Sequence, residues 1–149
     1  GIEHGAVMAL YYADEAIVVT NPEVSSVRDS DRILGVLQSK SKRAEEGADP
    51  VKEHLLLTRY DLDRVERGEM LAIDDVLEIL SIPLLGVIPE DQAVLRASNL
   101  GQPVVMDNES QPGQAYGDAV GRFLGEDIPH RFIKREKKGL FGRMFRRSA

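Results

Sequence analysis

The sequence has no cysteine, no tryptophan and few aromatic residues. Without cysteine, the chain forms no disulfide bonds and no thiolate-bound zinc site. Its three histidines, His4, His54 and His130, are far apart and lack the spacing of metal ligands, so we expect no metal site. The sequence also lacks a signal peptide and any run of the roughly 20 apolar residues that a membrane-spanning helix needs.

Recognisable catalytic motifs are absent too. No segment matches the phosphate-binding loop G-x-x-x-x-G-K-S/T, and there is no Ser-His-Asp set and no nucleophile elbow. We therefore expect no catalytic residues and no self-sufficient active site in these 149 residues. The chain opens at Gly1 without an initiator methionine, and we interpret it as the C-terminal part of a longer protein.

Charge is distributed unevenly along the chain. Residues 130–149 hold eight Lys or Arg and one Glu, for a net +7, and since the whole chain carries −6, residues 1–129 carry −13. An acidic body with a basic tail indicates an anionic surface as partner. We therefore divide the chain into an acidic body, residues 1–129, and an amphipathic membrane-targeting tail, residues 130–149.

The tail has the pattern of a helix that lies in a lipid interface. At 100° per residue its large apolar side chains fall within an arc of roughly 140°, and most of its basic residues fall outside that arc. The apolar residues are Ile133, Leu140, Phe141, Met144 and Phe145. Lys137 projects into the arc on a long stem, and we expect Lys137 and Lys138 to meet anionic headgroups. A solvated tail and a basic arm for nucleic acid stay open, although a nucleic-acid arm needs no apolar face.

Apolar runs and helical repeats alternate along the body. Apolar runs bounded by turn residues predict strands at residues 16–20, 53–59 and 84–88. Helices are predicted at residues 1–13, 21–40, 74–82, 90–98 and 115–124. Residues 61–68 are expected to form one or two helical turns, residues 41–52 a surface loop and residues 102–106 an extended segment. Strands that alternate with helices predict an α/β fold, a parallel sheet with flanking helices.

Several positions in these elements have a predicted environment. The run from Ala16 to Thr20 is typical of a strand buried on both faces. For the next helix the expected cap is Asn21, followed by Pro22 in the first turn, or else Ser25 or Ser26. That helix is predicted to bury Val27, Ile33, Leu34 and Leu37 and to expose Ser25, Arg28, Asp29 and Arg32. The helix from residue 74 is predicted to bury Val76, Leu77, Ile79 and Leu80. The helix that ends near Leu124 has Gly125 in the position of a C-terminal cap.

Polar turn residues follow each predicted strand. In open parallel sheets, ligands bind beyond the carboxyl ends of the strands. Those ends are Thr20–Glu23, Thr58–Tyr60 and Ile88–Asp91. The guanidinium of Arg59 is suited to stack on a flat base, and the turn at residues 89–91 is suited to offer backbone groups to base edges. The alternative is that these segments are only solvated turns.

Five blocks of the sequence, in this order, resemble a known family: Gly1–Ala6, Thr20–Ile33, His54–Tyr60, Gly86–Gln92 and the amphipathic tail. They are similar to the C-terminal half of the MinD family, division-site-selection ATPases of the deviant-Walker, ParA-like P-loop class. Each block alone is a weak match, but their conjunction is specific and covers nearly the whole chain.

The resemblance implies a function, cofactors and partners. It implies an ATPase that places the division septum, with ATP and Mg as cofactors, and a homodimer that forms with ATP. It also implies a cytoplasmic protein held peripherally on anionic lipid at the inner face of the cell membrane. The dimer would recruit MinC and be released by MinE, and we expect no nucleic acid as partner.

The resemblance also assigns residues. The base-side loops of the nucleotide site would be Arg59, Pro89, Glu90 and Asp91. The dimer and partner face would be Glu3, Glu23, Ser25 and Asp29. Because the phosphate loop and the Walker B aspartate are absent, the resemblance leaves open whether this chain is itself an enzyme. Two rival functions stay open, a ParA-like partitioning ATPase with a nucleic-acid-binding tail and a non-enzymatic membrane adaptor.

Overall fold

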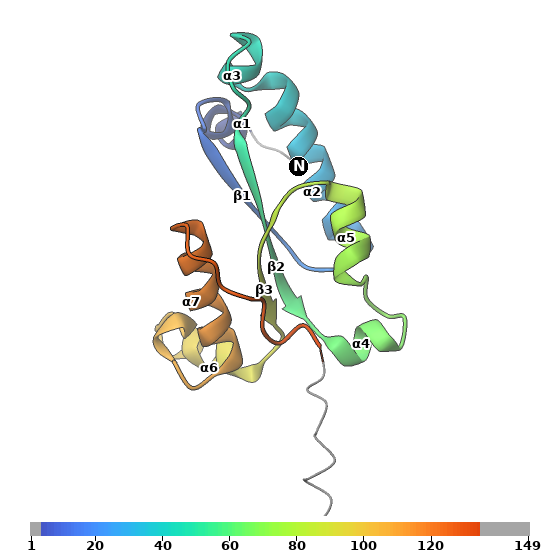
Figure 1. Ribbon diagram of the computed structural model, residues 1–149, viewed down its shortest axis with the longest axis vertical. Helices are drawn as coiled ribbons and strands as arrows, with labels where there is room; N and C mark the ends of the chain where they lie inside the picture. The colour runs from blue at the N-terminus through green and yellow to red at the C-terminus, as the bar shows by residue number, and fades with distance from the viewer. Residues whose placement is uncertain (1–3, 135–149) are drawn as a thin grey trace, which may run out of the picture.

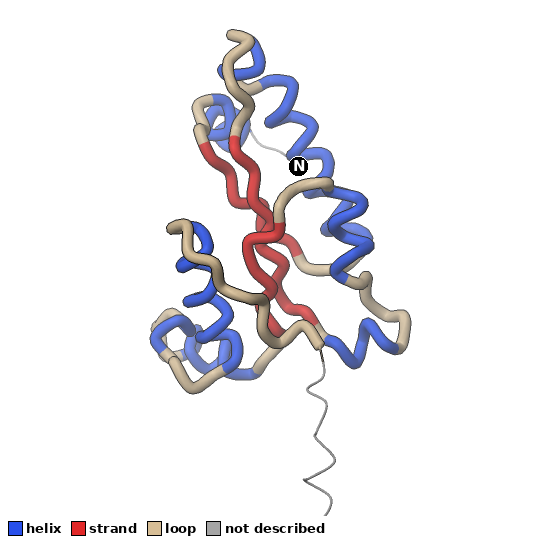
Figure 2. The backbone as a smooth tube through the Cα atoms, in the orientation of Figure 1, coloured by secondary structure: helices blue, strands red, loops and turns tan. Residues whose placement is uncertain are grey.

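The computed structural model describes residues 4–134, so Glu3 and the tail from residue 135 onward lie outside the described part. Figure 1 shows three strands flanked by helices, and Figure 2 shows the same backbone coloured by secondary structure. In chain order the elements are α1 His4–Tyr11, β1 Glu15–Thr20, α2 Val24–Lys40, α3 Lys42–Glu45, β2 Lys52–Tyr60, α4 Leu62–Glu66, α5 Ile73–Leu80, β3 Leu84–Pro89, α6 Gln92–Asn99, the 3₁₀ turn η1 Val104–Met106 and α7 Gln111–Phe123.

The strands form one parallel sheet. Their order is β1-β2-β3, with Val18 beside Leu55 and Leu57 beside Val87. Helices α2 and α5 lie on one side of the sheet, and α6 and α7 lie on the other (Figure 1). The predicted α/β fold with a parallel sheet and flanking helices is therefore confirmed.

The main core lies between the sheet and the α2/α5 layer. Val27 of α2, Leu55 and Leu57 of β2 and Val76 of α5 are completely buried there. Burial of four such side chains contributes on the order of 1.5–3 kcal/mol each. The predicted orientation of α2 is confirmed, because Val27, Leu34 and Leu37 are buried and Ile33 is partly buried. Its opposite face, Ser25, Arg28, Asp29 and Arg32, is exposed.

The prediction that the first strand is buried on both faces is wrong for the described residues. Ile17 and Val19 of β1 are 46% and 59% exposed, whereas Val18 and Thr20 on the other face are buried. The reason is that α7 packs on β3 and leaves the same side of β1 uncovered. The strand β3, between α7 and the core, is buried from Leu85 to Pro89.

Three local predictions are also corrected. The cap of α2 is Glu23, without a side-chain hydrogen bond, because the backbone stays extended through that residue. The predicted loop at residues 41–52 contains the short helix α3, since the Ser41 hydroxyl accepts a hydrogen bond from the Ala44 N–H at 3.2 Å. The predicted extended segment at residues 102–106 contains η1, closed by the Asp107 N–H on the Val104 carbonyl at 2.9 Å.

The helix α5 packs through a narrower stripe than predicted, and α7 packs closely on β3. In α5, Val76 and Leu80 are buried, Leu77 is partly buried and Ile79 is 47% exposed, because only residues four apart face the sheet. In α7, Ala119 packs closely against Gly86 of β3, where a side chain at position 86 would meet the Ala119 Cβ at 2.9 Å. The predicted end of α7 is confirmed, since Gly125 follows the helix with φ of +96°.

Candidate functional site

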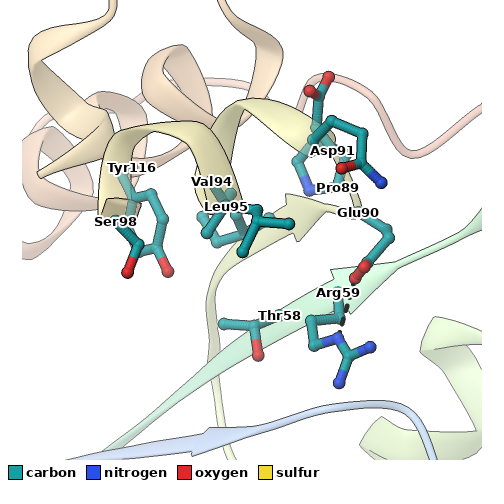
Figure 3. Close-up of a pocket in the computed structure, with 11 residues that line it drawn as sticks. Thr58, Arg59, Pro89, Glu90, Asp91, Val94, Leu95, Ser98 and Tyr116 are labelled. Carbon is teal, nitrogen blue, oxygen red and sulfur yellow. Dashed lines mark hydrogen bonds and ion pairs between the residues drawn. The ribbon is translucent and has the colours of Figure 1, made fainter. Parts of the chain in front are cut away.

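A cavity of about 360 Å³ lies where the carboxyl ends of β2 and β3 meet α6 and α7. All four residues predicted on the base side, Arg59, Pro89, Glu90 and Asp91, line it. Figure 3 shows Thr58 and Arg59 on β2 facing Val94, Leu95 and Ser98 of α6, with Tyr116 of α7 behind them. The remaining lining residues are Ile88 and Gln92. Residues separated by more than 50 positions in the sequence thus surround one space.

The rim of this cavity carries an ion pair. Nε of Arg59 lies 3.0 Å from Oε2 of Glu90 (Figure 3), and this hydrogen bond raises the pKa of Arg59 above its usual value. Both side chains are largely solvated, so the pair contributes little stability and is easily exchanged. Breaking this pair therefore costs little free energy.

The backbone explains how Arg59 reaches the rim. Arg59 has a positive φ of 56°, uncommon for a residue with a side chain. The pairing of β2 with β3 is shifted between Leu57 and Tyr60, and the Glu90 N–H donates to the Tyr60 carbonyl at 2.9 Å. The irregular end of β2 turns Arg59 out of the sheet and toward Glu90.

Asp91 has a structural role at the start of α6. Its carboxylate accepts a hydrogen bond from the Ala93 N–H at 2.7 Å, which caps the helix. The carboxylate is thereby committed to α6. The Asp91 side chain thus serves the helix, and the prediction that residues 89–91 offer backbone groups to a base stays a prediction.

The cavity combines an apolar wall with polar groups at its edge. Ile88, Pro89, Val94 and Leu95 supply apolar surface. Burial raises the pKa of the Tyr116 hydroxyl, so that group stays a proton donor at neutral pH. Such a cavity suits a flat heterocycle with polar edges. Between residues 4 and 134, no group of three or more histidine, cysteine or acidic side chains is placed to hold a metal ion.

The predicted partner face lies at the start of α2, away from the core. Ser25 and Asp29 are exposed, and Asp29 pairs with Arg32 at 3.3 Å. Glu23 is partly buried, and its carboxylate lies 3.9 Å from the guanidinium of Arg64 on α4. Three of the four predicted residues thus share one surface, while Glu3 lies outside the described residues.

Ile133 is the only predicted membrane residue in the described part of the chain. Its side chain is partly buried against the core cluster. The other predicted membrane residues, Lys137, Lys138, Leu140, Phe141, Met144 and Phe145, lie outside the described residues. Between residues 4 and 134, no helix has the length and apolar character to cross a bilayer.

Sequence reasoning missed the helical side of the cavity. Val94, Leu95 and Ser98 on α6 and Tyr116 on α7 line it but were not assigned to the site. The amphipathic repeat of α7 was a usable signal. Once the helix is known to pack on β3, the repeat shows on which face of the helix Tyr116 lies.

Comparison with known proteins extends this picture. No protein-family model matches the chain. The septum site-determining protein MinD of Escherichia coli K12 is 68% identical over 145 residues, which are 97% of this chain and 54% of that protein. MinD of Neisseria meningitidis is 62% identical over 145 residues, 97% of this chain and 53% of that protein. The chain thus spans about half the length of the curated relatives it matches.

Solved structures resemble the fold over a similar share. The Aquifex aeolicus MinC:MinD complex matches with a TM-score of 0.78 and 37% identity, covering 90% of this chain and 52% of that one. Pyrococcus horikoshii MinD complexed with Mg-ADP matches with a TM-score of 0.57 and 28% identity, covering 77% of this chain and 45% of that one.

The parallel sheet, its flanking helices and these structural relatives define part of a P-loop ATPase fold of the ParA/MinD class. Within that class, the chain belongs to the MinD family of septum site-determining proteins. The resemblance drawn from the sequence blocks is therefore confirmed.

Proposed function

We propose that this chain is part of a membrane-associated ATPase that places the division septum. The observation that carries the proposal is the 68% identity to E. coli MinD over 145 residues. The gathering of Arg59, Pro89, Glu90 and Asp91 around one cavity supports the nucleotide part of it.

In this proposal the chain holds the base of ATP. The apolar wall covers one face of the adenine, Arg59 leaves Glu90 to stack on the ring, and backbone groups of residues 89–91 meet its polar edge. The sequence has no phosphate-binding loop, so the phosphates and the Mg ion depend on residues outside these 149. A relative from Pyrococcus horikoshii was solved with Mg-ADP, which supports ATP and Mg as the cofactors.

The uncovered side of β1 is the proposed contact with the rest of the family fold. Ile17 and Val19 form a half-exposed apolar face, and Val120 and Phe123 of α7 are also exposed. The relatives are about twice as long as the part this chain matches, so additional chain is available to cover that face. Covering it removes apolar surface from water, which stabilises the joined fold.

The exposed start of α2 is the proposed site for partners. Ser25 and Asp29 are solvated, and Glu23 stands beside them. A structural relative is a MinC:MinD complex, which supports MinC as a partner. Under this proposal MinC, MinE and the second subunit of an ATP-dependent homodimer use overlapping parts of this face and Glu3.

The tail is the proposed membrane anchor. Its basic residues meet anionic headgroups at the cytoplasmic face of the membrane, and its apolar residues from Leu140 onward enter the interface. Ile133, predicted to join them, packs against the core instead. One such anchor binds weakly, whereas two anchors on a dimer gain a factor of about 10² to 10⁴ by avidity. Dimerisation with ATP then acts as the switch for membrane binding.

A chimera tests the proposal as a whole. The 145 matching residues of E. coli MinD are replaced by this chain, and the position of septa is scored in cells that lack their own MinD. The chimera is expected to restore septum placement. A chimera that accumulates normally but leaves septa misplaced contradicts the proposal, and competition between anionic vesicles and duplex DNA then tests the partitioning alternative.

Arg59→Ala in the purified chimera is expected to weaken binding of a fluorescent ATP analogue about 5- to 30-fold. A cation stacked on a ring contributes about 1–2 kcal/mol when the contact is partly desolvated, and that energy is lost. Arg67→Ala is the matched control, because Arg67 is also exposed and ion-paired, to Glu69 at 2.8 Å, but does not line the cavity. Equal affinities for the two variants would exclude Arg59 from the base site.

A further inference from the structure

Residues 126–134, here called the strap, fold back over the body after α7. Arg122 of α7 donates to three backbone carbonyls, those of Ile128 at 2.6 Å, Pro129 at 2.9 Å and Leu85 of β3 at 2.9 Å. Figure 1 shows the strap crossing β3 and reaching the carboxyl end of the sheet beside α4. Arg122 therefore ties the strap and the edge strand together and supplies a donor to an edge carbonyl.

The far half of the strap is held by a second arginine. Arg131 donates from Nε and Nη2 to the two carboxylate oxygens of Asp118, at 2.8 and 2.9 Å, and from Nη1 to Oε1 of Gln114 at 3.2 Å. The side chain of Asp118 is only 13% exposed. A bidentate ion pair with a mostly buried carboxylate is stronger and more directional than an ordinary surface ion pair.

Apolar contacts fix the strap between and beyond these arginines. Ile128 lies directly on Gly121 of α7, where a Cβ at position 121 would come within 2.5 Å of the Ile128 Cδ1. Ile133 packs against the core. The strap is thus attached to the body at three places: near its start, at Arg131 and at Ile133. The tail begins directly after the last of these attachments.

We propose that the strap positions the membrane tail, with Asp118 and Arg131 as the positioning residues. The inference rests on the proposed membrane function. With the whole strap attached, the last attachment before Leu140 is near residue 134; with the Asp118–Arg131 pair broken and the far half released, it is Pro129, which Arg122 still holds. The chain between the last attachment and Leu140 lengthens from about 6 to about 11 residues, which lowers the effective concentration of the second anchor about 2.5-fold.

The absence of cysteine makes the strap directly testable. A nitroxide on Lys134→Cys, which is exposed, reports the motion of the strap end in the 149-residue chain. The label is expected to move slowly in the parent and rapidly with Asp118→Asn. Asp127→Asn is the control, because it removes the same charge from an exposed strap residue outside the clamp. The exchange Asp118→Arg with Arg131→Asp is expected to restore slow motion. Equal label motion in the Asp118→Asn and Asp127→Asn variants overturns the proposal.

Vesicle binding tests what the strap does. In the chimera with ATP, Asp118→Asn is expected to bind phosphatidylglycerol-containing vesicles about 2.5-fold less well than Asp127→Asn. Equal binding overturns the positioning role. If the unmodified chimera itself does not bind these vesicles, the proposed membrane function fails, and the label motion alone decides whether the strap is a clamp.

Discussion

Phe141→Glu is expected to abolish binding to anionic vesicles, even where dimers form. Phe141 lies within the apolar arc of the tail, and losing its burial removes about 1.5–3 kcal/mol per anchor. The new carboxylate also faces an anionic leaflet, which opposes binding by about 1 kcal/mol more. The sum corresponds to a loss of roughly 100-fold or more per anchor, and a dimer loses both anchors at once. Sedimentation with vesicles measures this directly.

Gly142→Glu is the matched control for this prediction. It adds the same charge one residue later, but position 142 lies outside the apolar arc. We expect its binding to fall only about fivefold per anchor, the effect of one charge of about 1 kcal/mol. Normal sedimentation of the Phe141→Glu variant would contradict the lipid role of the tail, and equal losses in the two variants would reduce that role to net charge.

The parallel sheet and the orientation of α2 were predictable because their determinants are local. Val27, Leu34 and Leu37 repeat at helical spacing, and the sequence places them on one face without any knowledge of what they contact. The strands are short apolar runs between turn residues, and the helices between them restrict the sheet to parallel pairing. These patterns can be recognised without knowing which other elements pack against them.

The environment of β1 was not predictable in the same way. Ile17 and Val19 have the side chains of a buried strand, yet their exposure is decided by which helix lies over them. The helix α7 comes about a hundred residues later and packs on β3 instead. Whether the second face of a strand is buried depends on which elements pack on it in the folded protein, and the residues of the strand alone do not determine this.

The candidate site also contains residues that could be predicted from the sequence and residues that could not. Arg59 and the turn at residues 89–91 were predicted because they follow strands, and parallel strands bring their carboxyl ends to one edge. Tyr116 and Ser98 were missed because they reach the cavity only through the packing of α6 and α7. The pair of Arg131 with Asp118 was missed for a related reason, since Arg131 was counted as part of a free basic tail and its partner lies on a helix.

Two glycines of α7 provide the sharpest test of how this helix is packed. Gly113 is buried in the first turn, where a Cβ would overlap the Asp107 carbonyl oxygen and lie 2.8 Å from that of Val104. Both are backbone atoms of the η1 region, which have little freedom to move away. Gly113→Ala is therefore expected to destabilise the fold by about 3 kcal/mol, the upper end of the usual effect of overpacking.

Gly117 lies one turn later on the same helix, and a Cβ there would meet nothing within 4 Å. Gly117→Ala is expected to stabilise the fold by up to about 1 kcal/mol, because alanine is the better helix former. For a chain of this size, thermal unfolding should show Tm lowered by about 6–12 °C in the Gly113→Ala variant and raised by about 2–4 °C in the Gly117→Ala variant. Opposite signs from one substitution, four residues apart, require the first turn of α7 to rest on η1. A Tm that rises in both variants would mean that it does not, and the wall of the cavity that α7 provides through Tyr116 would then have to be reassigned.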